Sequence, residues 1–148
     1  MKSVEWHALW LAHLFQNAAL SSVGAGGGVP ASASDGSLYL SLHTEDPGSS
    51  TASGLANEVS YTGYARADMP RDASTWDVTD NVVTNLTAVL WPACTAGGVT
   101  ARYVGIWDSA STGAGVMLYS CALSQFLSIA GGLTPRIAAG GLVITEAV

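Results

Sequence analysis

Apolar and polar residues follow a helical spacing in the first segment of the chain. In residues 4–20, apolar side chains recur three or four positions apart, which is typical of an amphipathic helix. The apolar positions are Trp6, Trp10, Leu11, Leu14, Phe15 and Ala18. Two tryptophans have too much apolar area to leave in water. We therefore expect this helix to pack on its own domain, with a neighbouring subunit as the alternative.

The next segment, "SSVGAGGGVPASASDG" (21–36), contains almost no residue that would contribute to a hydrophobic core. Its glycines and serines end the helix and are typical of a flexible connection. The pattern predicts a linker, or an extended arm that reaches a neighbouring subunit.

Beyond residue 36 the pattern changes to strict alternation, which is the period of a β-strand. In "LYLSLH", Leu38, Leu40 and Leu42 fall on one face. Further strand candidates are "NEVSYTGYARADM", a hairpin "TWDVTDNVVTNL" that turns near Asp80-Asn81, "TAVLWPAC", "ARYVGIWDS", "VMLYSCALSQFLSI" and "PRIAAGGLVITEAV". Short strands separated by turn residues predict a mainly β fold, an antiparallel β-sandwich or jelly roll with one N-terminal α-helix. The expected organisation is a helix (1–20), a linker or arm (21–36) and a β-sandwich domain (37–148).

The composition indicates that other protein covers part of the surface. Charged residues make up 11% of the chain, whereas roughly 25% is typical of soluble domains. Hydrophobic residues make up 49%, and a soluble monomer rarely leaves so much apolar surface in contiguous patches. An alternative explanation is a β surface rich in Ser, Thr and Gly, which is polar without being charged.

The charge balance argues against two classes of partner. Five Lys and Arg against eleven Asp and Glu give a net charge of −6, and the cations do not cluster. Nucleic acids and anionic membranes both select clustered cations, so we expect neither as a partner. No apolar run is long enough for a membrane span. The first 20 residues lack the continuous apolar run of a signal peptide, so we expect a helix of the mature protein, with an export signal as the alternative.

The stretch His43-Thr44-Glu45-Asp46 is the strongest candidate for a metal or catalytic cluster. Adjacent residues in an extended segment point apart, so the two carboxylates supply too few converging ligands for a calcium site. Pro47 and Gly48 instead indicate a turn that ends the strand. We therefore predict no metal here.

Other chemical motifs are also missing from the sequence. It has no GxSxG elbow and no HExxH pattern, and two of its 3 histidines lie in the predicted helix. Cys94 and Cys121 show no metal-binding spacing and are interpreted as small buried thiols, although a disulfide stays open. The sequence predicts no catalytic residue, no cofactor and no enzymatic activity.

Three stretches together resemble a family of small tailed-phage virion proteins. They are "LYLSLHTEDPGSS…NEVSYTGYARADMPR", "WDVTDNVVTN…VLWPACTAGG…ARYVGIWDSASTGAGVMLYSCAL" and "LTPRIAAGGLVITE". Members carry an "LHTADPG…NEVSGGGYAR" pattern after a short N-terminal helix. Many are labelled tail fibre proteins, and others resemble capsid cement, or decoration, proteins. The resemblance covers nearly the whole chain and implies a structural role in the virion, with a β-sandwich or jelly-roll fold.

Two functions follow from this resemblance and from the low charge. The first is a capsid cement protein on the outer surface of the virion, which bridges and stabilises major capsid protein subunits. The alternative is a tail-fibre or baseplate component that contacts a host receptor or glycan. An enzyme such as a cell-wall hydrolase is the third and weakest hypothesis. The expected partners are the major capsid protein and further copies of this chain.

Interface candidates are large aromatic or apolar residues, which anchor protein interfaces, and arginines. In so uncharged a chain, each arginine is expected to pair with a carboxylate, within the fold or across an interface, with a solvated surface arginine as the alternative for any one of them. The candidates are Trp6, Trp10, Leu14, Tyr39, Tyr61, Tyr64, Arg66 and Arg71.

Overall fold

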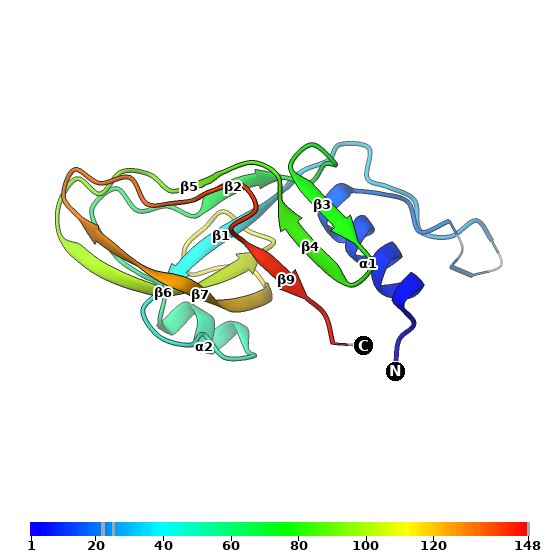
Figure 1. The fold of residues 1–148 in the computed structure, drawn as a ribbon, viewed down its shortest axis with the longest axis horizontal. Coiled ribbons are helices and arrows are strands. Elements are labelled where there is room, and N and C mark those ends of the chain that lie inside the picture. The colour runs from blue at the N-terminus through cyan, green and yellow to red at the C-terminus, as the bar shows by residue number, and fades with distance from the viewer. Residues whose placement is uncertain (22, 25, 148) are drawn as a thin grey trace. The chain divides into compact units, whose positions relative to one another are not determined.

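The computed structural model describes residues 1–21, 23–24 and 26–147, and it is mainly β with antiparallel sheets and one N-terminal helix (Figure 1). The helices are α1 (Val4–Gln16) and the short α2 (Thr51–Ala56). The strands are β1 (Ser37–His43), β2 (Ala67–Pro70), β3 (Trp76–Thr79), β4 (Val82–Asn85), β5 (Val89–Leu90), β6 (Gly98–Trp107), β7 (Met117–Ala130), β8 (Arg136–Ile137) and β9 (Val143–Thr145). The predicted fold class is confirmed and the sheets are consistent with a sandwich, while the jelly-roll topology stays a prediction.

The chain forms two compact units, and neither is one continuous stretch of sequence. The helix unit consists of residues 1–37, 70–88 and 138–147 and contains α1 and the sheet β3-β4-β9. The sheet unit consists of residues 38–69 and 89–137. It contains most of the four-stranded sheet β2-β1-β6-β7 and the pair β5-β8.

Capping side chains set the length of α1. The helix begins after Ser3, whose Oγ accepts a hydrogen bond from the Trp6 amide at 3.2 Å, as a serine N-cap does. It ends at Asn17, which adopts the left-handed conformation with φ 53°. The Asn17 side chain also binds both main-chain groups of Ser32, at 2.8 and 3.0 Å. The helix therefore stops four residues before the predicted end at residue 20.

The inner face of α1 packs on the β3–β4 hairpin of the same chain (Figure 1). Leu11 and Phe15 are completely buried. The Phe15 ring meets the buried Trp76 ring edge-on, with centroids 5.0 Å apart, and Gln16 donates a hydrogen bond to the Trp76 carbonyl at 2.8 Å. The expectation that the helix packs on its own chain is confirmed.

The segment predicted as a linker or arm folds back on the end of α1 in its described part. The Leu20 amide donates to the Val29 carbonyl at 2.8 Å, and the Val29 amide donates to the Leu20 carbonyl at 3.0 Å. These main-chain bonds close a loop within the segment, and the hydrogen bonds between the Asn17 side chain and Ser32 attach the segment to the end of α1. Composition alone could not predict this because main-chain pairing leaves no side-chain pattern.

The predicted hairpin is present and supports a third strand. Strands β3 and β4 pair with Val78 opposite Val83, and Asp80 in the turn has a positive φ of 55°, which aspartate tolerates better than most residues. Strand β9 pairs with β4, with Ile144 opposite Val83. The stretch "PRIAAGGLVITEAV", expected to be one strand, contains two short strands, since β8 pairs with β5 and β9 pairs with β4.

In the sheet unit, β1 is buried on both faces at its C-terminal end. Leu38, Leu40 and Leu42 are buried, as the alternation predicts, but Ser41 and His43 are also completely buried. Short helix α2, which the sequence pattern did not reveal, belongs to the same unit. A Cβ added at its Gly54 would lie 3.1 Å from the Trp107 ring, so the helix backbone approaches the sheet closely. The polar face of β1 is therefore an interior face.

Candidate functional site

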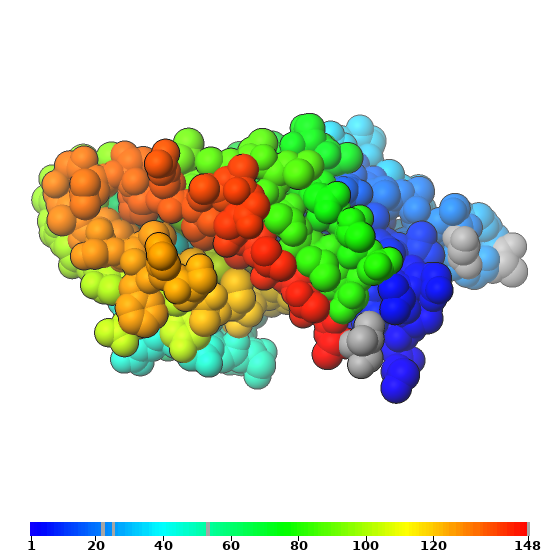
Figure 2. Space-filling view, viewed as in Figure 1, coloured from blue at the N-terminus to red at the C-terminus, as the bar shows by residue number. Residues whose placement is uncertain are grey.

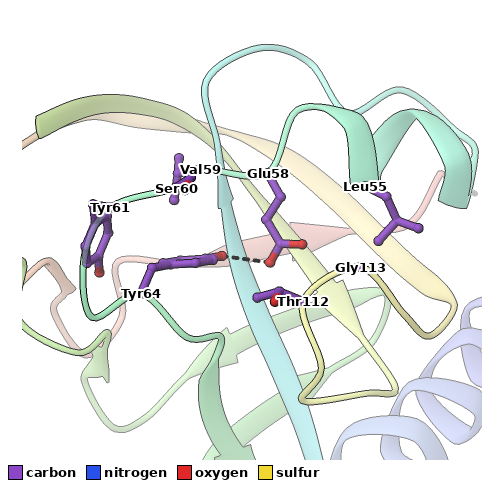
Figure 3. Close-up of a pocket in the computed structure, with 8 residues that line it drawn as sticks. All are labelled: Leu55, Glu58, Val59, Ser60, Tyr61, Tyr64, Thr112 and Gly113. Carbon is purple, nitrogen blue, oxygen red and sulfur yellow. Dashed lines mark hydrogen bonds between the residues drawn. The ribbon is translucent and has the colours of Figure 1, made fainter. Parts of the chain in front are cut away.

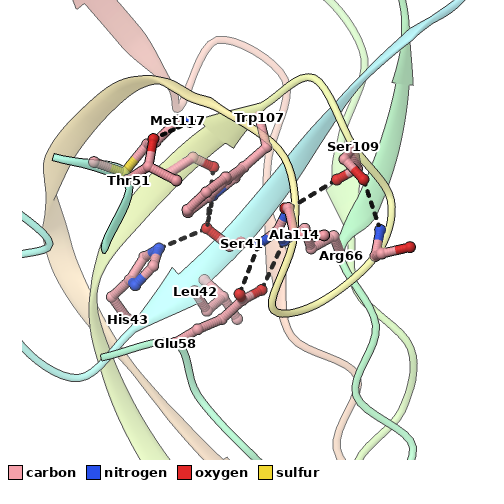
Figure 4. Close-up of polar contacts among 12 residues, drawn as sticks. Ser41, Leu42, His43, Thr51, Glu58, Arg66, Trp107, Ser109, Ala114 and Met117 are labelled. Carbon is pink, nitrogen blue, oxygen red and sulfur yellow. Dashed lines mark hydrogen bonds and ion pairs between the residues drawn. The ribbon is translucent and has the colours of Figure 1, made fainter. Parts of the chain in front are cut away.

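A buried ion pair forms the centre of the sheet unit's polar interior (Figure 4). Arg66 donates two hydrogen bonds to the Glu58 carboxylate, from Nε to Oε1 at 2.9 Å and from Nη2 to Oε2 at 2.8 Å. The two side chains are 0% and 6% exposed. The Arg66 guanidinium also stacks on the Trp107 ring, 3.9 Å from its centroid. Bidentate pairs of this kind combine charge with fixed orientation.

The same arginine fixes the loop between β6 and β7. Its Nη1 donates to the carbonyls of Ser109 and Ala114, both at 2.9 Å. At the base of the loop, the Asp108 carboxylate accepts a hydrogen bond from the Val116 amide at 2.7 Å. One buried guanidinium therefore neutralises Glu58, packs on Trp107 and orders residues 109–114.

A second chain of hydrogen bonds runs from Trp107 to His43 (Figure 4). The Trp107 indole donates to Ser41 Oγ at 2.6 Å, and Ser41 Oγ lies 2.6 Å from His43 Nε2. A serine next to a histidine is the arrangement of a nucleophile and its base. Both side chains are completely buried, so a substrate has no access to the hydroxyl in this structure. The expectation that the chain is not an enzyme stays a prediction.

Burial shifts the pKa values of two groups in this interior. It lowers the pKa of His43 to about 4, although the nearby Glu58 carboxylate acts in the opposite direction. Burial also raises the pKa of Tyr64 above its usual range, and the adjacent Glu58 carboxylate adds to that shift. Both groups are therefore neutral at pH 7, and the polar interior carries only the compensated charges of Glu58 and Arg66.

An open pocket of about 390 Å³, here called the Tyr64 pocket, lies against Glu58 (Figure 3). The Tyr61 and Tyr64 rings meet edge-on with centroids 5.2 Å apart. The Tyr64 hydroxyl donates to Glu58 Oε1 at 2.8 Å and accepts from the Leu42 amide at 3.1 Å. The lining residues are Leu55, Glu58, Val59, Ser60, Tyr61, Tyr64, Thr112 and Gly113. The polar atoms of Tyr64 and Glu58 in this pocket already bind each other within the fold.

A second pocket of about 250 Å³, here called the Phe126 pocket, combines an exposed ring with charged side chains. Phe126 is 61% exposed, and the Arg102 guanidinium lies 5.0 Å from the centroid of its ring. The lining residues are Thr44, Glu45, Asp46, Arg102, Tyr103, Ala122 and Phe126. The pocket therefore offers two aromatic rings, two carboxylates and one guanidinium.

An irregularity in the β6–β7 ladder places Phe126 at this pocket. Ala101 pairs with Leu127, whereas Tyr103, two residues later, pairs with Ala122. Four residues of β7, 123–126, are thus opposite a single residue of β6, Arg102. Bulges of this kind redirect side chains and are common next to binding sites.

The stretch His43-Thr44-Glu45-Asp46 is divided between the buried hydrogen-bond network and the Phe126 pocket. His43 belongs to the buried network, while Thr44, Glu45 and Asp46 line the Phe126 pocket. The Asp46 carboxylate accepts a hydrogen bond from the Gly48 amide at 2.8 Å, so the predicted turn is confirmed. Among residues 1–21, 23–24 and 26–147, no group of three or more His, Cys, Asp or Glu side chains is arranged to hold a metal ion.

The interface candidates of the helix unit lie on or beside α1. Trp10 is 36% exposed, and Trp6 and Leu14 are half-buried. Arg71 donates from Nε to the Leu14 carbonyl and from Nη2 to the His13 carbonyl, both at 2.6 Å. It therefore satisfies carbonyls at the helix end, whereas we expected it to pair with a carboxylate.

The remaining candidates belong to the sheet unit. Tyr39, on β1, is half-buried, while Tyr61, Tyr64 and Arg66 form the polar interior and the Tyr64 pocket. Arg66 pairs with a carboxylate within the fold, which was one of its two predicted partners. An interface role for any of the eight residues stays a prediction.

Sequence reasoning missed the Phe126 pocket. Simple alternation along β7 would place Phe126 on one face with Leu118, Ser120, Ala122, Ser124 and Ser128. The register shift at residues 123–126 breaks that alternation, so the strand pattern alone gives no reliable signal. Both cysteines are free in the structure, Cys94 buried and Cys121 half-buried. No helix in the described part of the chain is long and apolar enough to cross a membrane.

This fold is that of a small, mainly β protein with antiparallel sheets and one N-terminal helix. A family model described as "Podophage GP4 fiber I protein gp80" matches residues 8–145. The chain belongs to this family and is a structural protein of a phage virion. No curated protein matches the sequence. The family description supports the fibre alternative better than the capsid cement role, and the major capsid protein as a partner stays a prediction.

Proposed function

We propose that this protein is a component of a phage fibre and that its sheet unit binds a glycan on the host surface through the Phe126 pocket. The observation that carries the proposal is the exposed Phe126 ring beside Glu45, Asp46 and Arg102. The fibre family of the chain supports the location, and the pocket supports the contact with a ligand.

The chemistry of the pocket matches that of a sugar. A pyranose ring has an apolar face of C–H groups, which can stack on an aromatic ring such as Phe126. Its edge carries hydroxyls, which donate to carboxylates and accept from a guanidinium. The pocket has one negative charge in excess, because Arg102 is opposed by Glu45 and Asp46. We therefore expect neutral saccharides to bind better than acidic ones.

The pocket also has a firm base. Tyr103 on β6 is paired on both sides, with His43 of β1 and with Ala122 of β7, and Arg102 precedes it on the same strand. Glu45 and Asp46 lie in the turn that immediately follows β1, and this turn is closed by the Asp46–Gly48 hydrogen bond. A ligand would thus meet side chains whose backbone is already ordered, which reduces the entropy cost of binding.

Binding of the purified protein to a glycan array, and its ability to block adsorption of the phage, test this proposal. We expect Phe126→Ala to weaken glycan binding at least tenfold. The variant should also lose the ability to block adsorption of the phage. Glu45→Gln should weaken binding by a smaller factor. Leu90→Ala is the matched control, because Leu90 is exposed to a similar degree, 57%, and does not line the pocket. Equal binding by the wild type and Phe126→Ala would overturn the proposed site.

A further inference from the structure

Helix α1 presents large apolar side chains on the face that is turned away from its own sheet. The inner face holds the completely buried Leu11 and Phe15. Four residues at the spacing i, i+3, i+4 and i+7 share the opposite face, here called the outer face of α1. They are Trp6, Leu9, Trp10 and His13. Leu9 and Trp10 are each 36% exposed, and in Figure 2 the start of the chain, in dark blue, lies at the surface of the helix unit.

The outer face carries no charged residue, unlike the exposed face of an ordinary surface helix. From Trp6 to Ser34 the sequence contains no Asp, Glu, Lys or Arg. A surface helix normally has charged and polar residues opposite its buried stripe, and a helix that is apolar on all sides is usually buried. Tryptophan is also among the residues that most often anchor protein interfaces. The outer face therefore has the composition of a contact surface.

The two ends of α1 carry opposite charges. Glu5 lies exposed in the first turn, and the Arg71 guanidinium binds two main-chain carbonyls of the last turn. Lys2 pairs with Glu146 at 3.4 Å, and the Asp35 carboxylate accepts a side-chain hydrogen bond from the helix C-cap at 3.1 Å. Antiparallel pairing of two such helices brings each Glu5 towards Arg71 of the other copy, whereas parallel pairing brings like charges together. The helix dipoles favour the antiparallel arrangement as well.

We propose that the outer face of α1 packs antiparallel against the same face of a second copy of this chain, around a two-fold axis close to Leu9 and Trp10. Such a contact is self-complementary, so it ends at a dimer. The 13 residues of α1 span about 20 Å, so the interface is small and we expect a weak dimer. The inference is independent of the glycan proposal, because α1 and the Phe126 pocket belong to different units.

Sedimentation velocity of the full chain over a range of concentrations tests the pairing, with Leu9→Lys as the perturbation. The lysine places two like charges close to the two-fold axis, and it suits the helix because Glu5 precedes it by one turn. We expect the wild type to dimerise as its concentration rises and the dissociation constant to increase at least tenfold in Leu9→Lys.

Leu86→Lys is the matched control for this variant. Leu86 is 48% exposed and lies in the same unit, outside α1, so Leu86→Lys should dimerise like the wild type. A wild type that stays monomeric at its highest soluble concentration would overturn the proposal. So would a dimer that forms equally well in Leu9→Lys.

Glu5→Gln tests the orientation of the two helices. In the antiparallel dimer it removes two attractive contacts with Arg71, so the dissociation constant should increase at low salt. The increase should be about threefold, because exposed ion pairs contribute little. In a parallel dimer the same substitution would remove a repulsion between two copies of Glu5. An unchanged or smaller dissociation constant would therefore contradict antiparallel pairing.

Discussion

Glu58→Gln is expected to lower the free energy of unfolding by about 3–5 kcal/mol, the usual cost of breaking a buried ion pair. The substitution keeps the shape of the side chain and removes its charge, which leaves the Arg66 guanidinium buried without a counter-ion. The Tyr64 hydroxyl and the Arg66 Nε group also lose a charged acceptor, since both donate to Glu58 Oε1. Small domains have total stabilities of about 5–15 kcal/mol, so the variant should be severely weakened.

Denaturant unfolding of the wild type and the variant measures this difference. Arg136→Ala is a suitable control because Arg136 is exposed, and exposed substitutions usually change stability by less than about 0.5 kcal/mol. A loss for Glu58→Gln no larger than that of the control would show that the pair does not organise the interior.

Acid is expected to destabilise the protein through His43 as the pH falls below 6.5. The pKa of His43 falls from 6.5 to about 4 on folding, so between these values the unfolded chain binds a proton that the folded chain excludes. Above pH 6.5, His43 is neutral in both states and does not reduce the free energy of unfolding. As the pH falls from 6.5 towards 4, protonation of the unfolded chain lowers the free energy of unfolding. The loss should reach about 3 kcal/mol.

The variant His43→Gln isolates this effect, because it removes the titrating group and leaves the other acids and histidines in place. The free energy of unfolding would be measured for both proteins between pH 7 and pH 4. The advantage of the wild type over the variant should shrink as the pH falls. If the two free energies of unfolding differed by the same amount at every pH in this range, the lowered pKa of His43 would be contradicted.

Side-chain periodicity was enough to predict the helix, the hairpin and most strands. The stripe from Trp6 to Phe15 predicts α1, and the alternation around Asp80-Asn81 predicts β3 and β4. It failed where main-chain contacts decide the structure. The end of α1 at Asn17 and the pairing of Leu20 with Val29 depend on hydrogen bonds that leave no periodic pattern. Helix α2 is too short, and too rich in small residues, to show a helical stripe.

The candidate site was predicted only in part. The two motifs of the resemblance supply His43, Glu58, Tyr64 and Arg66, and the structure brings all four into one buried network. Sequence alone did not show that they meet, because β1 and the segment after α2 are brought together by the fold. The Phe126 pocket depends on a register shift in β7, which follows from the pairing of strands and is not visible in one strand.

Labelling of the protein within intact phage particles tests the fibre role most directly. Antibodies against the chain, located by electron microscopy, would show where the protein lies and how many copies a particle carries. Our account predicts label on the fibres at the tail, with a small number of copies per particle. Label spread over the head in hundreds of copies would contradict it and would indicate a capsid cement protein instead.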